Sequence, residues 1–141
     1  MSFKFKNQKY EVELEIEDYE FDSDVKDYYD LNWLVVKVIF KNRLTGKIIE
    51  KKDACILTYE LLGIKKWISS SKKELVFMEP CIELHKYGDS ITIELCYELS
   101  PENEECIDFK CRVNSNKKLL MFKEETEKYI EKYPVRNIKG V

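Results

Sequence analysis

Carboxylate side chains gather in one segment of this chain, and aromatic rings are interleaved with them. Residues 11 to 30 hold ten acids and a single base, Lys26, so this segment carries −9 while the whole chain carries −3. Carboxylates at this density can coordinate a divalent cation, act in pairs in hydrolysis, or attract a basic partner. The acids are Glu11, Glu13, Glu15, Glu17, Asp18, Glu20, Asp22, Asp24, Asp27 and Asp30, and the aromatic residues among them are Tyr19, Phe21, Tyr28 and Tyr29.

Of these three chemistries, attraction of a basic protein fits the pattern best. Asp22, Asp24 and Asp27 lack the glycine turn and the closing glutamate of a calcium loop. Paired hydrolytic carboxylates have no distinguishing pattern where acids are so abundant. Aromatic residues among charges are frequent interface anchors, and an acidic surface speeds association with a basic partner. The alternative is a solvated strand face followed by an acidic loop. The predicted partner-binding residues are Glu13, Glu15, Glu17, Tyr19, Asp22, Asp24, Asp27, Tyr28 and Tyr29.

The other reactive residues indicate no catalytic or metal centre. His85 is the only histidine, and a solvated or hydrogen-bonded strand histidine explains it better than a catalytic base does. The four glycines are isolated, which excludes a phosphate-cradling loop. The five cysteines form no CxxC pair, and we expect reduced, mostly buried thiols. The sequence therefore predicts no enzyme, no metal and no cofactor.

Length and overall charge narrow the class of protein further. A chain of 141 residues suits a single domain, here residues 1–141. No apolar run approaches the roughly 20 residues of a membrane span, and the charged N-terminus does not resemble a signal peptide. We therefore expect a cytoplasmic protein without membrane contact. The net charge of −3 and a pI near 5.4 oppose nucleic-acid binding.

Alternating hydrophobicity predicts the strands that must position the acidic segment. Residues 10–17 alternate strictly, with Val12, Leu14 and Ile16 facing inward. Residues 18–30 are predicted to form a long loop, and residues 33–40 a central strand because both faces are apolar. Further strands are predicted at residues 47–56, 74–79, 81–87, 91–99 and 107–113.

Two helices complete the predicted architecture. Thr58 is the predicted N-cap of a helix over residues 59–70, whose apolar stripe consists of Leu61, Leu62, Ile64, Trp67 and Ile68. Asn114 or Ser115 is predicted to cap a second helix over residues 116–132, which Pro134 ends. The expected fold is α+β, a mostly antiparallel β-sheet or sandwich of six to eight strands with two amphipathic α-helices.

Short segments spread over most of the length resemble the WapI-like family of bacterial immunity proteins. The combination of a Thr-x-Glu-Leu helix start with a later Phe-x-Glu-Pro segment is the most specific part of the resemblance. The similar segments are Asp30-Leu31-Asn32-Trp33-Leu34-Val35-Val36, Leu57-Thr58-Tyr59-Glu60-Leu61, Trp67-Ile68, Leu75-Val76-Phe77-Met78-Glu79-Pro80-Cys81-Ile82 and Tyr133-Pro134-Val135-Arg136.

This resemblance implies a small cytosolic protein that protects its own bacterium from a secreted polymorphic toxin. The family's model member neutralises a toxin domain that cleaves transfer RNA, and immunity proteins act by stoichiometric binding without catalysis. The implied partner is the C-terminal domain of a cognate toxin, and the acidic segment could imitate nucleic-acid charge in the toxin's basic cleft. Two alternatives are a non-catalytic accessory module with another partner and a small hydrolase that uses Asp and Glu.

Overall fold

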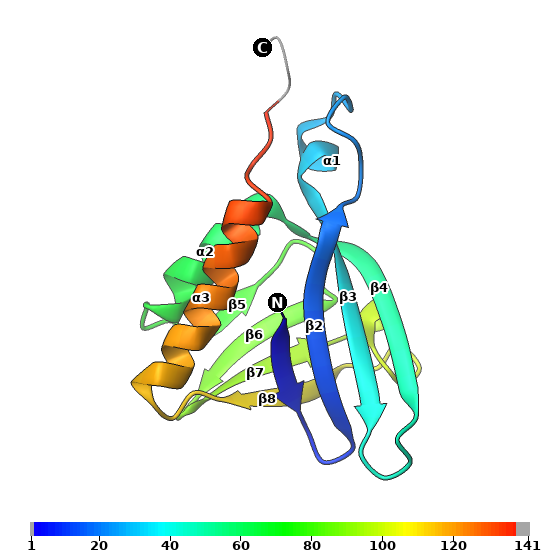
Figure 1. Cartoon of the computed structure of the whole chain (residues 1–141), viewed down its shortest axis with the longest axis vertical. Coiled ribbons are helices and arrows are strands. Elements are labelled where there is room, and N and C mark those ends of the chain that lie inside the picture. Colours follow the sequence, from blue (N-terminus) through cyan, green and yellow to red (C-terminus); the bar gives the residue numbers. More distant parts are fainter. Residues whose placement is uncertain (1, 138–141) are drawn as a thin grey trace.

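One antiparallel sheet of eight strands organises the chain and curls into a half-barrel (Figure 1). The structure is a computed structural model and describes residues 2–137. The strands lie in the order β4-β3-β2-β1-β8-β7-β6-β5, which confirms the predicted α+β class and a mostly antiparallel sheet. Their bounds are β1 Phe3–Lys6, β2 Tyr10–Tyr19, β3 Trp33–Asn42, β4 Ile48–Leu57, β5 Glu74–Val76, β6 Ile82–Tyr87, β7 Ser90–Leu95 and β8 Ile107–Arg112.

The sheet consists of two hairpin-connected parts that meet at a narrow seam between β1 and β8. The register between these two strands contains one residue pair, Lys6 with Lys110. On its other side β1 pairs with only the first part of β2, from Glu11 to Leu14. The second part of β2 therefore has no strand on that side, and its edge carbonyls need other donors.

Alternating burial places the core on the inner face of the curled sheet. Val12, Leu14 and Ile16 of β2 are buried, as their spacing predicts. The central position of β3 between β2 and β4 is also confirmed, and its four inward residues are fully buried. The residues on its other face are mostly half-buried. The inward residues of β3 are Leu34, Val36, Val38 and Phe40.

Helices α2 (Thr58–Ile68) and α3 (Asn116–Lys132) lie side by side and pack on the inner face of the sheet (Figure 1). The α3 ring of Phe122 lies 4.9 Å from that of Phe3 on β1, between ring centres. The two predicted amphipathic helices are thus confirmed. Leu61, Ile64, Trp67 and Ile68 of α2 are buried as expected, whereas Leu62 is 39% exposed and does not belong to the stripe.

Helix α3 also satisfies the edge of β2 that lacks a neighbouring strand. The hydroxyl of Tyr133, directly after α3, donates to the carbonyl of Glu17 at 2.6 Å. The same hydroxyl lies 3.4 Å from the carbonyl of Ile16. The Tyr133 hydroxyl thus takes the place of a backbone donor, which explains why this polar group can be buried here.

The cap of α2 differs from the prediction. Leu57 occupies the N-cap position, and Thr58 is the first helical residue. The Thr58 hydroxyl donates to Asn32 Oδ1 at 2.7 Å, so it is used in a tertiary contact and not for capping. The predicted cap of α3 is correct, because Ser115 Oγ accepts from the backbone N–H of Lys118 at 3.2 Å.

Two other segments differ from their predicted structure. The long loop predicted for residues 18–30 contains the start of a short helix, α1 (Tyr28–Asn32). The strand predicted for residues 91–99 ends at Leu95, and a 3₁₀ turn, η1 (Tyr97–Leu99), follows. Tyr97 has a φ of 53°, which no strand residue adopts.

The cysteines are not all reduced, contrary to the prediction. Cys96 and Cys106 form a disulfide, whereas Cys55, Cys81 and Cys111 are free thiols. The pairing follows from the sheet register, because Leu95 of β7 lies opposite Ile107 of β8 and brings the adjoining cysteines together. Spacing along the sequence alone does not show that register.

Candidate protein-binding surface

The turn between β2 and β3 projects from one end of the molecule, with α1 at its base (Figure 1). We call residues 18–32 the acidic tip. Its six carboxylates and one lysine give a net charge of −5. The carboxylates belong to Asp18, Glu20, Asp22, Asp24, Asp27 and Asp30.

A single buried amide fixes the tip to the rest of the chain. Asn32 is fully buried, and its Nδ2 donates to the carbonyls of Tyr28 at 2.8 Å and Arg136 at 3.0 Å. Its Oδ1 accepts from the Thr58 hydroxyl at 2.7 Å and from the Arg136 backbone N–H at 2.8 Å. Both N–H donors and both oxygen lone pairs of the Asn32 amide are therefore used. One side chain joins α1, the start of α2 and the segment after α3.

A second clamp holds the tip through the side chains of Tyr19 and Arg136. The Arg136 guanidinium lies 3.3 Å from the centre of the Tyr19 ring, a stacked cation–π arrangement. Its Nη1 donates to the carbonyl of Phe21 at 3.0 Å. The Tyr19 hydroxyl donates to the carbonyl of Pro134 at 2.5 Å. The pKa of Tyr19 is raised mainly because the ring is partly buried. This tyrosine therefore supports the tip more than it offers a free ring to a partner.

Asp27 shapes the short helix that carries the exposed aromatic residues. Its carboxylate caps α1 by accepting from the backbone N–H groups of Tyr29 at 2.9 Å and Asp30 at 3.1 Å. The helix so begun presents Tyr28 and Tyr29, which are 36% and 48% exposed and lie edge to face at 5.8 Å. Nearby Phe21 is 40% exposed.

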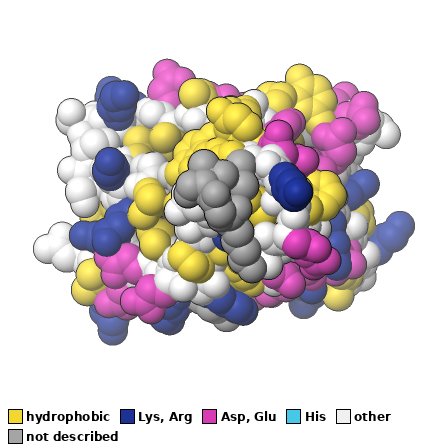
Figure 2. Space-filling view, turned by 90° about the horizontal axis from the view of Figure 1, so that it is seen from above, with side chains coloured by type: hydrophobic (Ala, Val, Ile, Leu, Met, Phe, Trp, Pro, Cys, Tyr) yellow, Lys and Arg dark blue, Asp and Glu magenta, His cyan; other side chains and the backbone are white. Residues whose placement is uncertain are grey.

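The end of the molecule that carries the tip combines apolar and charged surface. Figure 2 shows hydrophobic side chains gathered near the centre of this end, with acidic side chains on several sides of them. Burial raises the pKa of the α2 residue Tyr59, and the nearby Tyr29 raises it further. An apolar centre with a charged border is the usual composition of a protein interface.

The negative charge of the tip is only weakly compensated. Burial raises the pKa of Glu20, and the neighbouring carboxylates of Asp30 and Asp53 raise it further. The part of the shift that Asp30 and Asp53 cause reflects repulsion between carboxylates, which a nearby positive charge would relieve. Asp22 and Asp24 are exposed and form no ion pair within residues 2–137.

The three predicted glutamates on β2 are in a different electrostatic setting. Lys37 on β3 lies 3.1 Å from Glu15 and 3.6 Å from Glu17. Lys52 on β4 lies 3.0 Å from Glu17, and Lys4 on β1 lies 3.7 Å from Glu13. These lysines come from neighbouring strands and neutralise much of the charge that the sequence concentrates there.

The structure thus divides the nine predicted residues into two groups. Six of them meet at the tip, whereas three lie farther along β2 among lysines. Asn32 and Arg136, which hold the tip in place, were not predicted as site residues. The signal for Asn32 in the sequence was its position as a polar residue between the apolar Leu31 and Trp33, which indicates a buried amide with specific partners. The tip residues are Tyr19, Asp22, Asp24, Asp27, Tyr28 and Tyr29, and the strand residues are Glu13, Glu15 and Glu17.

Comparison with known proteins places the chain in a family. The model of the immunity protein WapI-like family matches residues 2–134. The chain belongs to the WapI-like immunity protein family. No curated protein and no solved structure matches it. Within the described residues of this family member, no helix has the length and apolar character needed to cross a membrane.

Proposed function

We propose that this WapI-like protein is a cytoplasmic immunity protein that neutralises a cognate toxin by direct binding. The partner would be the C-terminal domain of the toxin, and the acidic tip would be the main contact. The observation that carries this proposal is the exposed Tyr28–Tyr29 pair, held by Asn32 within a segment of net charge −5. Rigid aromatic residues surrounded by charge supply both affinity and fast association.

A nuclease such as a tRNase is the class of toxin that this surface fits best. A nuclease holds its substrate in a basic cleft, because the substrate backbone carries one negative charge per nucleotide. The exposed carboxylates of Asp22 and Asp24 can occupy such a cleft as substitutes for phosphates. Stoichiometric occupation of the cleft blocks substrate entry, and no catalytic group of the immunity protein is required.

The nine predicted residues would contribute unequally to this contact. Tyr28 and Tyr29 would bury apolar surface at the centre, with Asp22 and Asp24 as their acidic neighbours. Asp27 and Tyr19 would act mainly by holding the tip, since both already bond within the chain. Glu13, Glu15 and Glu17 would form the outer border, where ion pairs with lysines reduce their attraction for a partner.

Capture of the partner is the first experiment. A tagged copy is recovered from the native bacterium at low and at high salt, and bound proteins are identified by mass spectrometry. The toxin domain is then purified, and its binding and the inhibition of its activity are measured. We expect a one-to-one complex whose association rate falls as salt rises.

A pair of matched double variants tests the role of the tip. Asp22→Lys with Asp24→Lys changes the charge at the tip, and Glu124→Lys with Glu131→Lys makes the same change on exposed positions of α3. The tip variant should associate at least about tenfold more slowly and lose most of the salt dependence. The α3 variant should behave as the wild type does. Equal effects of both variants would contradict binding through the tip.

A further inference from the structure

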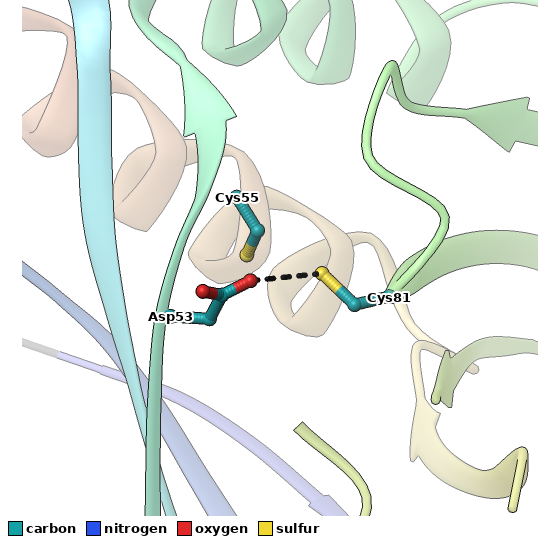
Figure 3. Close-up of side chains that lie close together, drawn as sticks. All are labelled: Asp53, Cys55 and Cys81. Carbon is teal, nitrogen blue, oxygen red and sulfur yellow. Dashed lines mark hydrogen bonds between the residues drawn. The ribbon is translucent and has the colours of Figure 1, made fainter. Parts of the chain in front are cut away.

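Three side chains able to bind a metal meet between β4 and the segment that precedes β6. Asp53 and Cys55 lie on β4, and Cys81 lies directly before β6 (Figure 3). The carboxylate oxygen and the two sulfur atoms all lie within 4.8 Å of one another. The Cys81 thiol points at Asp53 Oδ2 over 3.9 Å. Both thiols are reduced, and their residues are 0% and 2% exposed.

The fold brings these residues together in a defined way. Asp53 and Cys55 are two positions apart on an edge strand, so both point toward the same side. The register with β3 shifts at this point, because Leu34 lies opposite Ile56 and Val35 opposite Ala54. Cys55 is therefore the extra residue of a bulge. Cys81 approaches from the other half of the curled sheet and lies 28 residues after Asp53 in the sequence.

The donor atoms match the ligand preferences of zinc. Zinc is bound by thiolate and carboxylate ligands at about 2.3 Å and about 2.0–2.2 Å, and tetrahedral geometry then places ligand atoms roughly 3.5–3.8 Å apart. The sulfur–oxygen separation of 3.9 Å between Cys81 and Asp53 needs only a small adjustment to reach this spacing. We propose that Cys55, Cys81 and Asp53 bind a thiolate-preferring divalent cation such as Zn²⁺, with water in the fourth position.

The electrostatic surroundings of the three residues favour a cation. The hydrogen bond with Cys81 and burial raise the pKa of the Cys55 thiol well above its usual range, and the charges of Asp53 and Glu60 raise it further. Burial and then Glu98 on η1 raise the pKa of Asp53. Within residues 2–137, Asp53 takes part in no ion pair.

Cation binding at thiolate ligands depends on pH, and the affinity should rise as the pH rises. A cysteine binds a cation as the thiolate, so protons and metal compete for the same sulfur atoms. The carboxylates that act on Cys55 are those of Asp53, on the same strand, and Glu60 on α2. Glu98 on η1 acts on Asp53 in the same sense.

Titration of the full chain with Co²⁺, followed by competition with Zn²⁺, tests the site. Bound thiolate gives a Co²⁺ charge-transfer absorption, which reports sulfur ligation directly. We expect one equivalent of Co²⁺, displaced by Zn²⁺, with an affinity that rises at least about tenfold per pH unit between pH 6.5 and 7.5. The Cys81→Ser variant should lose the absorption band, and Asp53→Asn should bind at least about tenfold more weakly. Cys111→Ser, a half-buried thiol on β8, should bind as the wild type does.

Three results would overturn the proposal. The first is an absence of cobalt or zinc binding by the wild-type chain. The second is unchanged binding in Asp53→Asn, a variant at a partly exposed position that should keep the fold even where Cys81→Ser does not. The third is a Cys55–Cys81 disulfide in the protein as isolated, found by peptide mapping. No toxin enters this experiment, so its result is independent of the proposed immunity function.

Discussion

Glu60 on α2 accepts a hydrogen bond from the backbone N–H of Met78, with 3.0 Å between the carboxylate oxygen and the nitrogen. Its other oxygen accepts from the backbone N–H of Leu57 at 2.9 Å. The two segments that carry the family resemblance, Thr-x-Glu-Leu and Phe-x-Glu-Pro, are thus joined by one carboxylate. The first segment supplies the acceptor and the second supplies the donor, which gives a structural reason for their occurrence together.

Removal of this carboxylate should destabilise the protein without a direct effect on the tip. We expect Glu60→Ala to lower the free energy of unfolding by about 2 kcal/mol, because two backbone donors lose a charged acceptor. Glu60→Gln keeps one acceptor oxygen and should lose about 1 kcal/mol. Urea denaturation of both variants measures the difference. A loss of the same size in Glu79→Ala, at the neighbouring acid, would argue against a specific role for Glu60.

The Asn32 amide should be the most sensitive polar group near the tip. Asn32→Ala breaks four hydrogen bonds and leaves buried partners unpaired, so we expect a loss of about 2–3 kcal/mol in unfolding free energy. Hydrogen exchange should also accelerate for the amides of α1. Asn114→Ala, at an exposed position, is the control. Unaltered exchange in α1 would show that other contacts suffice to hold the tip.

The exposed tyrosine pair should supply much of the binding energy for the toxin domain. Joint replacement by Tyr28→Ala and Tyr29→Ala should weaken binding by at least about 2 kcal/mol, mainly through faster dissociation. Tyr87→Ala removes a tyrosine that is 59% exposed elsewhere and should leave binding unchanged. Surface plasmon resonance separates the two rate constants. Similar dissociation rates for the pair variant and the wild type would place the contact on another surface.

High pH should unfold the protein in part through Tyr129. This residue is 1% exposed, and burial raises its pKa to about 12. The unfolded chain loses this proton near pH 10, whereas the folded chain keeps it up to about pH 12. The contribution to stability is therefore complete below pH 10 and disappears as the pH rises from 10 to 12, an effect of about 3 kcal/mol.

Substitution at this tyrosine provides the test. Between pH 9 and 12, the unfolding free energy of Tyr129→Phe should fall less steeply than that of the wild type. Tyr87→Phe, at an exposed tyrosine, should keep the wild-type slope. Chemical denaturation at each pH gives the three curves. Identical slopes for all three would show that other groups cause the alkaline unfolding.

The Cys96–Cys106 disulfide closes a short loop and should stabilise the protein through the unfolded state. The two cysteines are ten residues apart, for which loop-closure entropy predicts about 3 kcal/mol. The double variant Cys96→Ser and Cys106→Ser should lose roughly this amount in denaturation experiments. Treatment of the wild type with a reductant should reproduce the loss, and Cys111→Ser should not. A wild type that is insensitive to reductant would indicate that the loop is held by its other contacts.

Patterns among residues close in the sequence correctly predicted β2 and α3, because alternation and helical periodicity are local properties. Strict alternation identified β2 and its buried residues, and the 3.6-residue period with Ser115 at its start identified α3 within its observed bounds. The prediction failed for Thr58, because a residue suited to capping found a tertiary partner in Asn32. Capping preference is a local property. It does not decide the role of a threonine whose hydroxyl can donate to an acceptor distant in the sequence.

The candidate surface was harder to predict because its charges are balanced across strands. The acidity of residues 11–30 is visible in the sequence, but Lys37 and Lys52 compensate it only through the pairing of β2, β3 and β4. The disulfide likewise depends on the register of β7 and β8. The register between strands depends on contacts between residues far apart in the sequence. Composition alone therefore overstated the acidic surface along β2 and missed the lysines that neighbouring strands place there.

The contact between Asn32 and Arg136 has a consequence for the timing of protection in a growing cell. The two residues are 104 positions apart, and translation at about 5–20 residues per second needs about 5–20 s to cover that distance. During this interval the tip has been synthesised but lacks the arginine that stacks on Tyr19 and closes the clamp. Under the proposed function, resistance should therefore depend on completed molecules, because an unfinished chain lacks this clamp.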